Sequence, residues 1–437
     1  MKRSFSQRTL FIILFCSVFP LASLGVDPKT GQRIDEEIDK HTPEIIKIRR
    51  FIHMNPELSN REYETAKLVT SKLTSLGLDV QTGIAKTGVV GLLRGGQPGP
   101  TIAIRADMDA LPIQELSGIP YKSLNPGVMH ACGHDIHTSI ALGTAMILSS
   151  MKDKMKGNIK FIFQPAEEGP PQDEEGGADL MIKEGVLENP SVGAIFGLHV
   201  WPDDLGQVYF SPGFILASSD SFQIKIKGKS AHGARPQEGI DSIVLASEVI
   251  IGLQSIISRE IDPTDPAVLT IGKIEGGTRS NIIADKVTLE GTVRALSETN
   301  RKKIPRLIEN LVKGLTQSCG ASYTLNYEPS LPSVYNHPEL GKNMLPTLVR
   351  LFGEDRVKQM SPQMVSDDFS YFAQKIPGFY FFLGVKTPGP QPAAPLHSPY
   401  FNPDERSISF GIKAMCHLLL DCLAQQSSLE TLPQKSS

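Results

Sequence analysis

Few cysteines and little net charge set the first limits on this chain of 437 residues. It contains 5 Cys, and one of them, Cys16, lies in an apolar N-terminal run. The other four are few and widely spread in a large chain, which excludes a disulfide framework. The formal net charge is -3 without a block of like charge, so there is no basic surface for nucleic acid. The sequence also lacks a G-x-S-x-G motif, so a serine hydrolase is poorly supported. The length predicts two domains, and a hydrophobic content of 40% with 21% charged residues is typical of a soluble globular protein.

The N-terminus predicts a cleavable secretory signal over residues 1–25. A basic start is followed by an apolar run of 13 residues, Leu10–Ala22, which is short for a membrane span, and then by the small residues Ser23–Gly25. An uncleaved anchor is the alternative. We expect an exported protein, in a periplasm, the medium or an ER lumen, with no membrane association after the signal is removed.

Helical and strand patterns alternate over residues 36–214 and again over residues 331–425. The apolar strands GVVGLLRG and TIAIRADMD are separated by QPGP, which predicts a turn, and the helix HTSIALGTAMILSSM is expected to begin near Asp135 or Thr138. Alternation of this kind predicts an α/β domain with a mainly parallel sheet.

The pattern changes over residues 215–330. Segments there alternate apolar and polar residues, as strands with one wet face do, in the order strand, helix, two strands, helix, strand. This order predicts a compact α+β domain of ferredoxin-like type, inserted into the larger α/β domain.

The segment MHACGHDIHT, residues 129–138, concentrates the side chains that bind transition metals. Cys132 and His134 lie two positions apart, so an extended segment points both to one side. Asp135 and His137 lie beside them. The alternatives are a Cys that fills apolar space and a His in ordinary hydrogen bonds, but the grouping favours a metal site, which would also protect the thiol of an exported protein.

Two pairs of carboxylates follow apolar strands. Glu167 and Glu168 end IKFIFQPAEEG, where desolvation is costly without partners, and their opposite directions allow one to bind metal while the other acts as general base. Asp107 and Asp109 end TIAIRADMD and point to one side, where one could support a metal or a His ring. The aspartate pair is weak evidence by itself.

Other polar residues are candidates for functional roles because of their positions. His199 ends AIFGLHVWP and His397 opens HSPYFNPDE, and functional groups of α/β sheets collect at strand ends. In the smaller domain, His232, Asn281 and Arg294 could form a polar cluster that faces the main site if the domains close. An Arg suits a substrate carboxylate. Each of these residues alone could be an ordinary surface residue.

The motifs RADMDALP, MHACGHD, FQPAEEG, GLHV, AHGARP, GTVR, SDDF and HSPYF occur in this order. Together they resemble the amidohydrolase family of hippurate hydrolases, N-acyl-amino-acid hydrolases and plant indoleacetyl-amino-acid hydrolases. That family is a branch of the aminoacylase and carboxypeptidase di-metal peptidases. The resemblance extends over nearly all of residues 36–425.

The resemblance implies a site for two divalent ions (zinc, manganese, cobalt or nickel) in the larger domain. It also implies that the inserted domain is a lid and the contact surface of a homodimer. The metal-ligand positions of the family match Cys132, His134, Glu168, His199 and His397.

The remaining roles also come from the resemblance. Glu167 matches the general base, and Asp109 matches the carboxylate that steadies the site. His232 matches the lid His that helps to hold the scissile carbonyl, which in related enzymes comes from the partner subunit. Asn281 and Arg294 match lid residues that grip substrate. The sequence departs from the family at Ala284, where Pro is usual, at Asp367, where Glu is common, and in the longer loop PPQDEE.

We therefore expect a secreted enzyme that cleaves the amide bond of hippurate-like N-acyl-L-amino acids by metal-activated water, with Glu167 as base. A carboxypeptidase or dipeptidase that acts on short peptides at the same site is the nearest alternative. A secreted binding protein with an inactive site is a third, but binding alone does not need a base such as Glu167.

Overall fold

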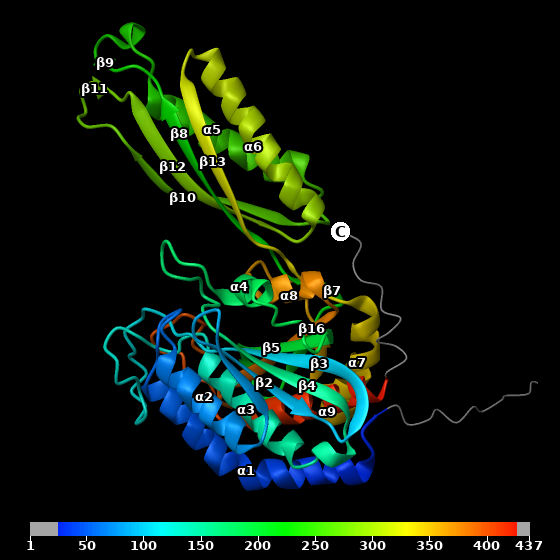
Figure 1. The fold of residues 1–437 in the computed structure, drawn as a ribbon. Coiled ribbons are helices and arrows are strands. Elements are labelled where there is room, and N and C mark those ends of the chain that lie inside the picture. Colours follow the sequence, from blue (N-terminus) through cyan, green and yellow to red (C-terminus); the bar gives the residue numbers. More distant parts are fainter. Residues whose placement is uncertain (1–24, 426–437) are drawn as a thin grey trace, which may run out of the picture.

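The computed structural model describes residues 25–425, so nearly all of the predicted signal peptide lies outside the described residues. These residues form two lobes, each built around its own sheet (Figure 1). The larger lobe contains both ends of the described chain, and the smaller lobe is formed by residues between them. We call them the large lobe and the small lobe.

The large lobe is built on an eight-stranded sheet. In spatial order the strands are β1 (Asp79–Ile84), β2 (Gly88–Arg94), β4 (Lys156–Gln164), β3 (Gln97–Asp107), β5 (Val192–Asp204), β16 (Gly378–Lys386), β6 (Val208–Phe210) and β15 (Val357–Gln359). The four central strands β4, β3, β5 and β16 are mutually parallel, which confirms the predicted mainly parallel sheet. The predicted turn QPGP is wrong: these residues begin β3, because Gln97 pairs with Lys156 of β4, and the chain bends just before them, at Gly96.

Helices bury both faces of this sheet. One face packs against α1 (Pro28–Met54), α2 (Tyr63–Ser75), α3 (His134–Ser149), α7 (Pro338–Phe352) and α9 (Ser407–Ala424). The other face packs against α4 (Gly177–Lys183) and α8 (Phe369–Lys375). Because both faces are covered, the central strands are buried almost continuously, and eight of the nine residues of β16 are buried.

The small lobe confirms the predicted ferredoxin-like arrangement. Its elements are β8 (Ser219–Lys227), α5 (Ser242–Ser255), β10 (Ala267–Gly276), β12 (Lys286–Ala295), α6 (Glu298–Ser318) and β13 (Ser322–Leu331). The strands form an antiparallel sheet in the order β10-β12-β8-β13. Both helices cover one face and enclose a separate apolar core around Ile224, Leu289 and Ile308. The other face is open, so burial alternates along β8.

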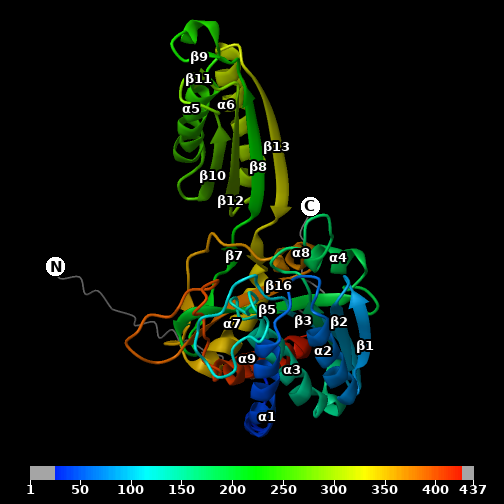
Figure 2. The same ribbon diagram turned by 90° about the vertical axis from the view of Figure 1, so that its left-hand side faces the viewer.

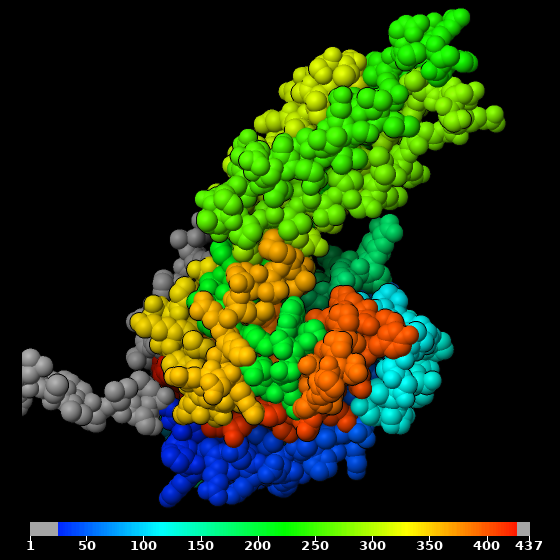
Figure 3. All heavy atoms as spheres, turned by 180° about the vertical axis from the view of Figure 1, so that it is seen from behind, coloured from blue at the N-terminus to red at the C-terminus, as the bar shows by residue number. Residues whose placement is uncertain are grey.

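The lobes are joined where β7 (Gly213–Leu216) pairs with β14 (Val334–Asn336). Figure 2 shows β7 between the two lobes. Next to this junction, the buried carboxylate of Asp220 accepts hydrogen bonds from Arg301, Tyr327 and the Ser330 N–H. The small lobe stands out from the large one in the space-filling view (Figure 3). A short pair, β9 (Ala231–His232) with β11 (Ile282–Ile283), lies at its far end (Figure 1).

Short elements complete the described chain: the single helical turns Lys152–Lys154, Pro236–Glu238 and Ile256–Glu260. Two helical stretches, Ser242–Glu260 and Ser407–Ala424, are long and apolar enough to cross a membrane by composition alone. The second of these is α9, which packs against α1 and α3 in the core of the large lobe and is accounted for by that packing.

Candidate metal centre

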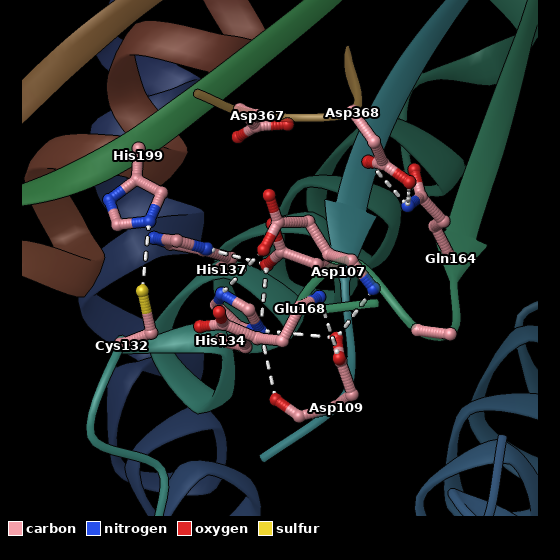
Figure 4. A network of polar contacts seen from close by, with 12 residues as sticks. Asp107, Asp109, Cys132, His134, His137, Gln164, Glu168, His199, Asp367 and Asp368 are labelled. Atoms are coloured by element: carbon pink, nitrogen blue, oxygen red, sulfur yellow. Dashed lines mark hydrogen bonds and ion pairs between the residues drawn. The ribbon is translucent and has the colours of Figure 1, made fainter. Parts of the chain in front are cut away.

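The predicted ligands meet at the carboxyl edge of the parallel sheet. Figure 4 shows four of them, Cys132, His134, Glu168 and His199. Glu168 lies in the turn that follows β4, His199 lies in β5, and His397 lies in the loop after β16. Cys132 and His134 lie at the start of α3, which packs against β3 and β5. The topology explains the convergence, because parallel strands deliver the residues at their carboxyl ends to one edge.

The ligand atoms lie close enough to share bound ions. Cys132 Sγ is 3.3 Å from His199 Nε2 and 3.3 Å from His397 Nε2. His397 Nε2 is also 3.3 Å from Glu168 Oε1. Two triplets of donor atoms, Cys132–His134–His199 and Cys132–Glu168–His397, each lie within 4.8 Å, with Cys132 in both. Two overlapping groups around one thiol suit a pair of adjacent ions.

The imidazole rings are oriented to present lone pairs to this cluster. His134 Nδ1 donates to the Asp109 carbonyl oxygen at 2.8 Å, and within the described residues its buried Nε2 has no hydrogen-bond partner. His199 Nδ1 donates to the Val200 carbonyl oxygen at 2.6 Å, so its Nε2 faces Cys132 as an acceptor. A ring fixed through one nitrogen with the other directed at a cluster of donors is typical of a metal ligand.

The electrostatics of the cluster also favour cations. Burial and the Glu168 carboxylate raise the pKa of the Cys132 thiol well above its ordinary value, so a thiolate needs a cation beside it to form. Burial opposes charge on His134, but Asp107 and Asp109 outweigh it and raise the pKa of that imidazole to about 10. A buried site with this excess of carboxylates attracts positive charge, which divalent ions would supply. The residues present therefore fit a metal centre.

Asp109 holds the turn that carries the two glutamates. Its carboxylate accepts the backbone N–H of Glu167 at 3.1 Å and of Glu168 at 3.0 Å, and the hydroxyl of Ser59 at 2.8 Å. Through its own carbonyl it also orients His134. Asp109 thus supports both the predicted base and the predicted ligand His134.

Glu167 lies beside the cluster in a strongly acidic environment. Its Oε2 is 3.8 Å from His134 Nε2. Burial, Asp367 and Glu168 raise its pKa well above the ordinary value. A carboxyl group whose pKa is raised in this way is suited to accept and return a proton near neutral pH.

A buried arginine balances the neighbouring carboxylates. Arg105 Nη1 is 2.6 Å from Asp107, and its Nη2 is 2.7 Å from Asp368 and 3.2 Å from Asp367. Asp367 also accepts the Tyr380 hydroxyl at 2.6 Å. Asp367, the departure noted in the sequence, is therefore firmly held on the wall of the site.

Two residues of the motif have other partners. His137 Nδ1 donates to Asp107 at 2.6 Å and its Nε2 accepts the Val200 N–H at 2.9 Å, so both ring nitrogens are engaged. Asp135 faces α1, where His53 Nδ1 and Arg49 Nε each lie 2.8 Å from it. The helix begins at His134, one residue before the expected Asp135, because Gly133 precedes it with φ +88° where a Cβ would meet Val200 at 2.4 Å.

The cluster opens into a cavity of about 590 Å³. The floor of the cavity includes Cys132, Glu167, Glu168, His199 and His397. Its walls are largely apolar, formed by Trp201, Leu216, Leu331, Val365, Phe382 and Leu396. Trp201, the single Trp of the chain, packs on Phe382 with ring centroids 4.7 Å apart. The cavity can therefore accept an apolar group next to the cluster.

The predicted lid residues His232, Asn281 and Arg294 do not line this cavity within one chain. His232 and Asn281 are neighbours at the β9–β11 end of the small lobe, where the Gly233 N–H donates to the Asn281 carbonyl oxygen at 2.8 Å, and both are exposed. Arg294 is half-buried in β12, towards the junction of the lobes. The expected polar cluster is thus divided between two ends of the lobe.

Sequence reasoning missed several residues that support the site. Ser59 and Glu62 lie in the loop between α1 and α2. Arg105 and Gln164 lie in the central strands. Nothing in their local sequence distinguishes any one of these residues from an ordinary polar residue. A cluster of polar residues in NPELSNRE was the available signal for the first two, but their partners are far away in sequence.

Comparisons with known proteins agree with this geometry. Among curated proteins, the chain is 42% identical to the Arabidopsis thaliana IAA-amino acid hydrolase ILR1-like 4, over 84% of this chain and 83% of that protein. It is 42% identical to the N-acyl-L-amino acid amidohydrolase of Geobacillus stearothermophilus (71% and 82%). It is 39% identical to thermostable carboxypeptidase 2 of Saccharolobus solfataricus (89% and 97%).

A solved structure, the Bacillus subtilis YXEP protein, is described as a dinuclear metal-binding peptidase of family M20. It superposes with a TM-score of 0.76 at 34% identity, over 88% of this chain and 99% of that one. The sequence pattern of Peptidase family M20/M25/M40 matches residues 103–421. The resemblance found in the motifs is confirmed, and so are the expected metal-dependent hydrolase class and a dinuclear type of centre with the metal left open. The chain belongs to peptidase family M20/M25/M40.

Proposed function

We propose that this protein hydrolyses the amide bond of N-acyl-L-amino acids with an apolar, hippurate-like acyl group. The observation that carries the proposal is the joint placement of a five-residue ligand cluster, the half-buried Glu167 and a largely apolar cavity at one sheet edge. An acyl group would lie against Trp201, Phe382 and Leu396, and the amide would face the cluster.

The chain's own residues can then carry the proton transfers. Two divalent ions, when bound, would polarise the amide carbonyl and lower the pKa of a water molecule. Cys132, His134, Glu168, His199 and His397 would hold them. Glu167 accepts the proton of the attacking water and returns it to the nitrogen of the leaving amino acid as the carbon–nitrogen bond breaks. Asp109 keeps the backbone of Glu167 in place during both transfers.

Cleavage of short peptides is the second candidate, favoured by the carboxypeptidase among the relatives. A dipeptide would bring a free ammonium group into the acyl side of the cavity. The carboxylate on that wall, Asp367, is already held by Arg105, Tyr380 and the Phe369 N–H. An uncharged acyl group fits the apolar wall better, because it needs no new ionic partner.

A substrate panel tests the proposal. The purified enzyme should release amino acids from N-benzoyl and other N-acyl amino acids at least tenfold faster, by kcat/KM, than from dipeptides with the same C-terminal residue. A chelator should abolish turnover, and zinc, manganese, cobalt or nickel should restore it. Preference for dipeptides would instead establish the peptidase, and turnover that survives exhaustive chelation would contradict both.

We also propose that the lobe residues act in a second copy of the chain. The apolar side chains on α5 support this, because Ile251 is 73% and Val244 is 56% exposed in the single chain. A homodimer through the small lobe would cover them and would carry His232, with Asn281 and Arg294, towards a partner's cavity.

Export of the protein is a further proposal, which rests on the N-terminal pattern. The N-terminal sequence of the protein purified from its host would test it.

A further inference from the structure

The loop between α1 and α2, residues 55–62, packs against the turn that carries Glu167 and Glu168. We call this turn the catalytic turn. Leu58 forms a bridge with Ala110, which brings the loop against the end of β3. From this loop, Ser59 donates to Asp109, as described above. Asn60 donates to the Glu174 carboxylate and to the Glu175 carbonyl oxygen, each at 3.1 Å. The loop therefore contacts both the segment after β3 and the chain that follows Glu167.

Glu62 makes the closest connection to the turn. Its Oε1 accepts the backbone N–H of Ala166 at 2.9 Å and of Asn60 at 3.0 Å, and its Oε2 accepts the Thr87 hydroxyl. The side chain is fully buried and does not line the cavity. Glu62 therefore cannot touch substrate, and whatever it contributes to catalysis passes through Ala166.

Ala166 needs such support because its backbone is in the left-handed region. Its φ is +53°, a conformation that costs a residue with a Cβ on the order of 1 kcal/mol. It immediately precedes Glu167, so its dihedral angles set the direction of that side chain. The three successive N–H groups of Ala166, Glu167 and Glu168 are all held by two buried carboxylates, Glu62 and Asp109.

We propose that Glu62 is a positioning residue of the active site, which holds Ala166 in the left-handed conformation and so directs Glu167 at the cavity. This inference rests on the proposed role of Glu167 as general base. Small errors in the placement of a base are costly, since a displacement of about 1 Å can reduce turnover about 100-fold. Loss of the Glu62 acceptor should therefore lower kcat and leave KM and metal binding nearly unchanged.

Substitutions at Glu62 separate positioning from general stability. Glu62→Leu keeps much of the volume but removes both acceptors, and Glu62→Asp withdraws them by one methylene. Glu62→Gln retains an oxygen for the two N–H groups and places an amide group beside Thr87. Thr87→Val is a matched control, because it removes the third hydrogen bond and leaves the two backbone ones in place.

We expect kcat to fall about 100-fold in Glu62→Leu and at least 10-fold in Glu62→Asp, with KM and bound metal within about twofold of wild type. Glu62→Gln and Thr87→Val should stay within about threefold of wild-type kcat. Hydrogen exchange, read by mass spectrometry on a peptide spanning 164–168, should be faster in the Leu and Asp variants only. This measurement reports on the turn without reference to activity.

Equal kcat in the Leu variant and wild type would overturn the inference. So would a parallel loss of metal and activity in all three Glu62 variants, because that indicates a general structural role. If Glu62→Leu does not fold, the comparison of Glu62→Asp with Glu62→Gln tests the inference instead. Equal kcat values in these two variants would overturn it. Failure of the proposed function is distinct: the wild type would then hydrolyse nothing in the panel, or Glu167→Gln would remain active.

Discussion

At the scale of single residues, the site depends on pairs of neighbours with different tasks. Glu167 and Glu168 are adjacent, yet Glu168 lies 3.3 Å from His397 within the ligand cluster while Glu167 faces the acidic group around Arg105. The same separation occurs at Cys132 and His134, which join the cluster, and at Asp135, which turns away to α1. Alternating directions of successive side chains allow one short segment to build a site and its support.

Replacement of Glu167 by Gln tests the base. The amide keeps the size and polarity of the side chain but cannot accept the proton of water. We expect kcat to fall by about 1,000-fold, because general base catalysis contributes roughly 100- to 10,000-fold. Metal content, measured by atomic emission, should remain at the wild-type level, and thermal unfolding should change little. A variant with wild-type turnover would remove Glu167 from the mechanism.

At the scale of elements, connecting segments fix the site as firmly as the strands do. The loop 55–62 holds the catalytic turn, and the start of α3 is fixed against α1 through Asp135, Arg49 and His53. The polar side chains that form both supports are buried, so they hold specific geometry and are sensitive to the charge state of their members.

Glu62 gives the loop a measurable pH dependence. Burial, followed by the Asp109 carboxylate, raises the pKa of Glu62 to about 7. In the unfolded chain Glu titrates near about 4.3, so the folded protein holds the proton more tightly. The stabilisation that Glu62 contributes is therefore fully present below about pH 4.3 and is lost as the pH rises to about 7.

Glu62→Gln removes this titration. Between pH 4 and pH 8, the free energy of unfolding of the variant should rise relative to that of wild type by up to about 3 kcal/mol, from about 1.4 kcal/mol for each unit of pKa shift. Urea unfolding of both metal-free proteins across this range measures the difference. Parallel pH profiles would show that Glu62 is not the titrating group.

At the scale of the whole molecule, the two lobes divide the work. The large lobe holds the cluster, the proposed base and most of the cavity wall, whereas His232 lies in β9 at the far end of the small lobe (Figures 1 and 2). A site completed by a second chain would explain why an exposed His and an exposed apolar helix face occur on the same lobe. In a two-fold dimer, each small lobe can serve the partner's cavity.

Co-expression of two inactive variants tests this arrangement. In a mixed dimer of Glu167→Gln and His232→Ala, one site combines an intact large lobe with an intact His232, so random pairing should restore about a quarter of wild-type activity. The pair Glu167→Gln with Cys132→Ser is the matched control, because every site then retains a defective large lobe. Activity no higher than that of the separate variants would contradict a shared site.

The sequence by itself determined the fold class and the chemistry of the centre. Periodicity distinguishes a sheet buried on both faces from one with a wet face, and the spacing of Cys132 and His134 predicts a metal site, because these signals are local. The convergence of His199 and His397 followed only from the expectation that parallel strands share one functional edge. The predicted turn at QPGP failed because Gln97 already pairs with Lys156 of β4, and the ladder only shifts register before it resumes at Thr101.

Only the tertiary structure decided which polar residues support the site and where the lid residues lie. Glu62 and Ala166 are separated by about a hundred residues, and their hydrogen bond depends on how a loop packs beneath a sheet. Likewise, His232 and Arg294 belong to one lobe but to opposite ends of it, which follows from strand order and register. Contacts between distant segments arise from tertiary packing, and no local pattern of residues specifies that packing.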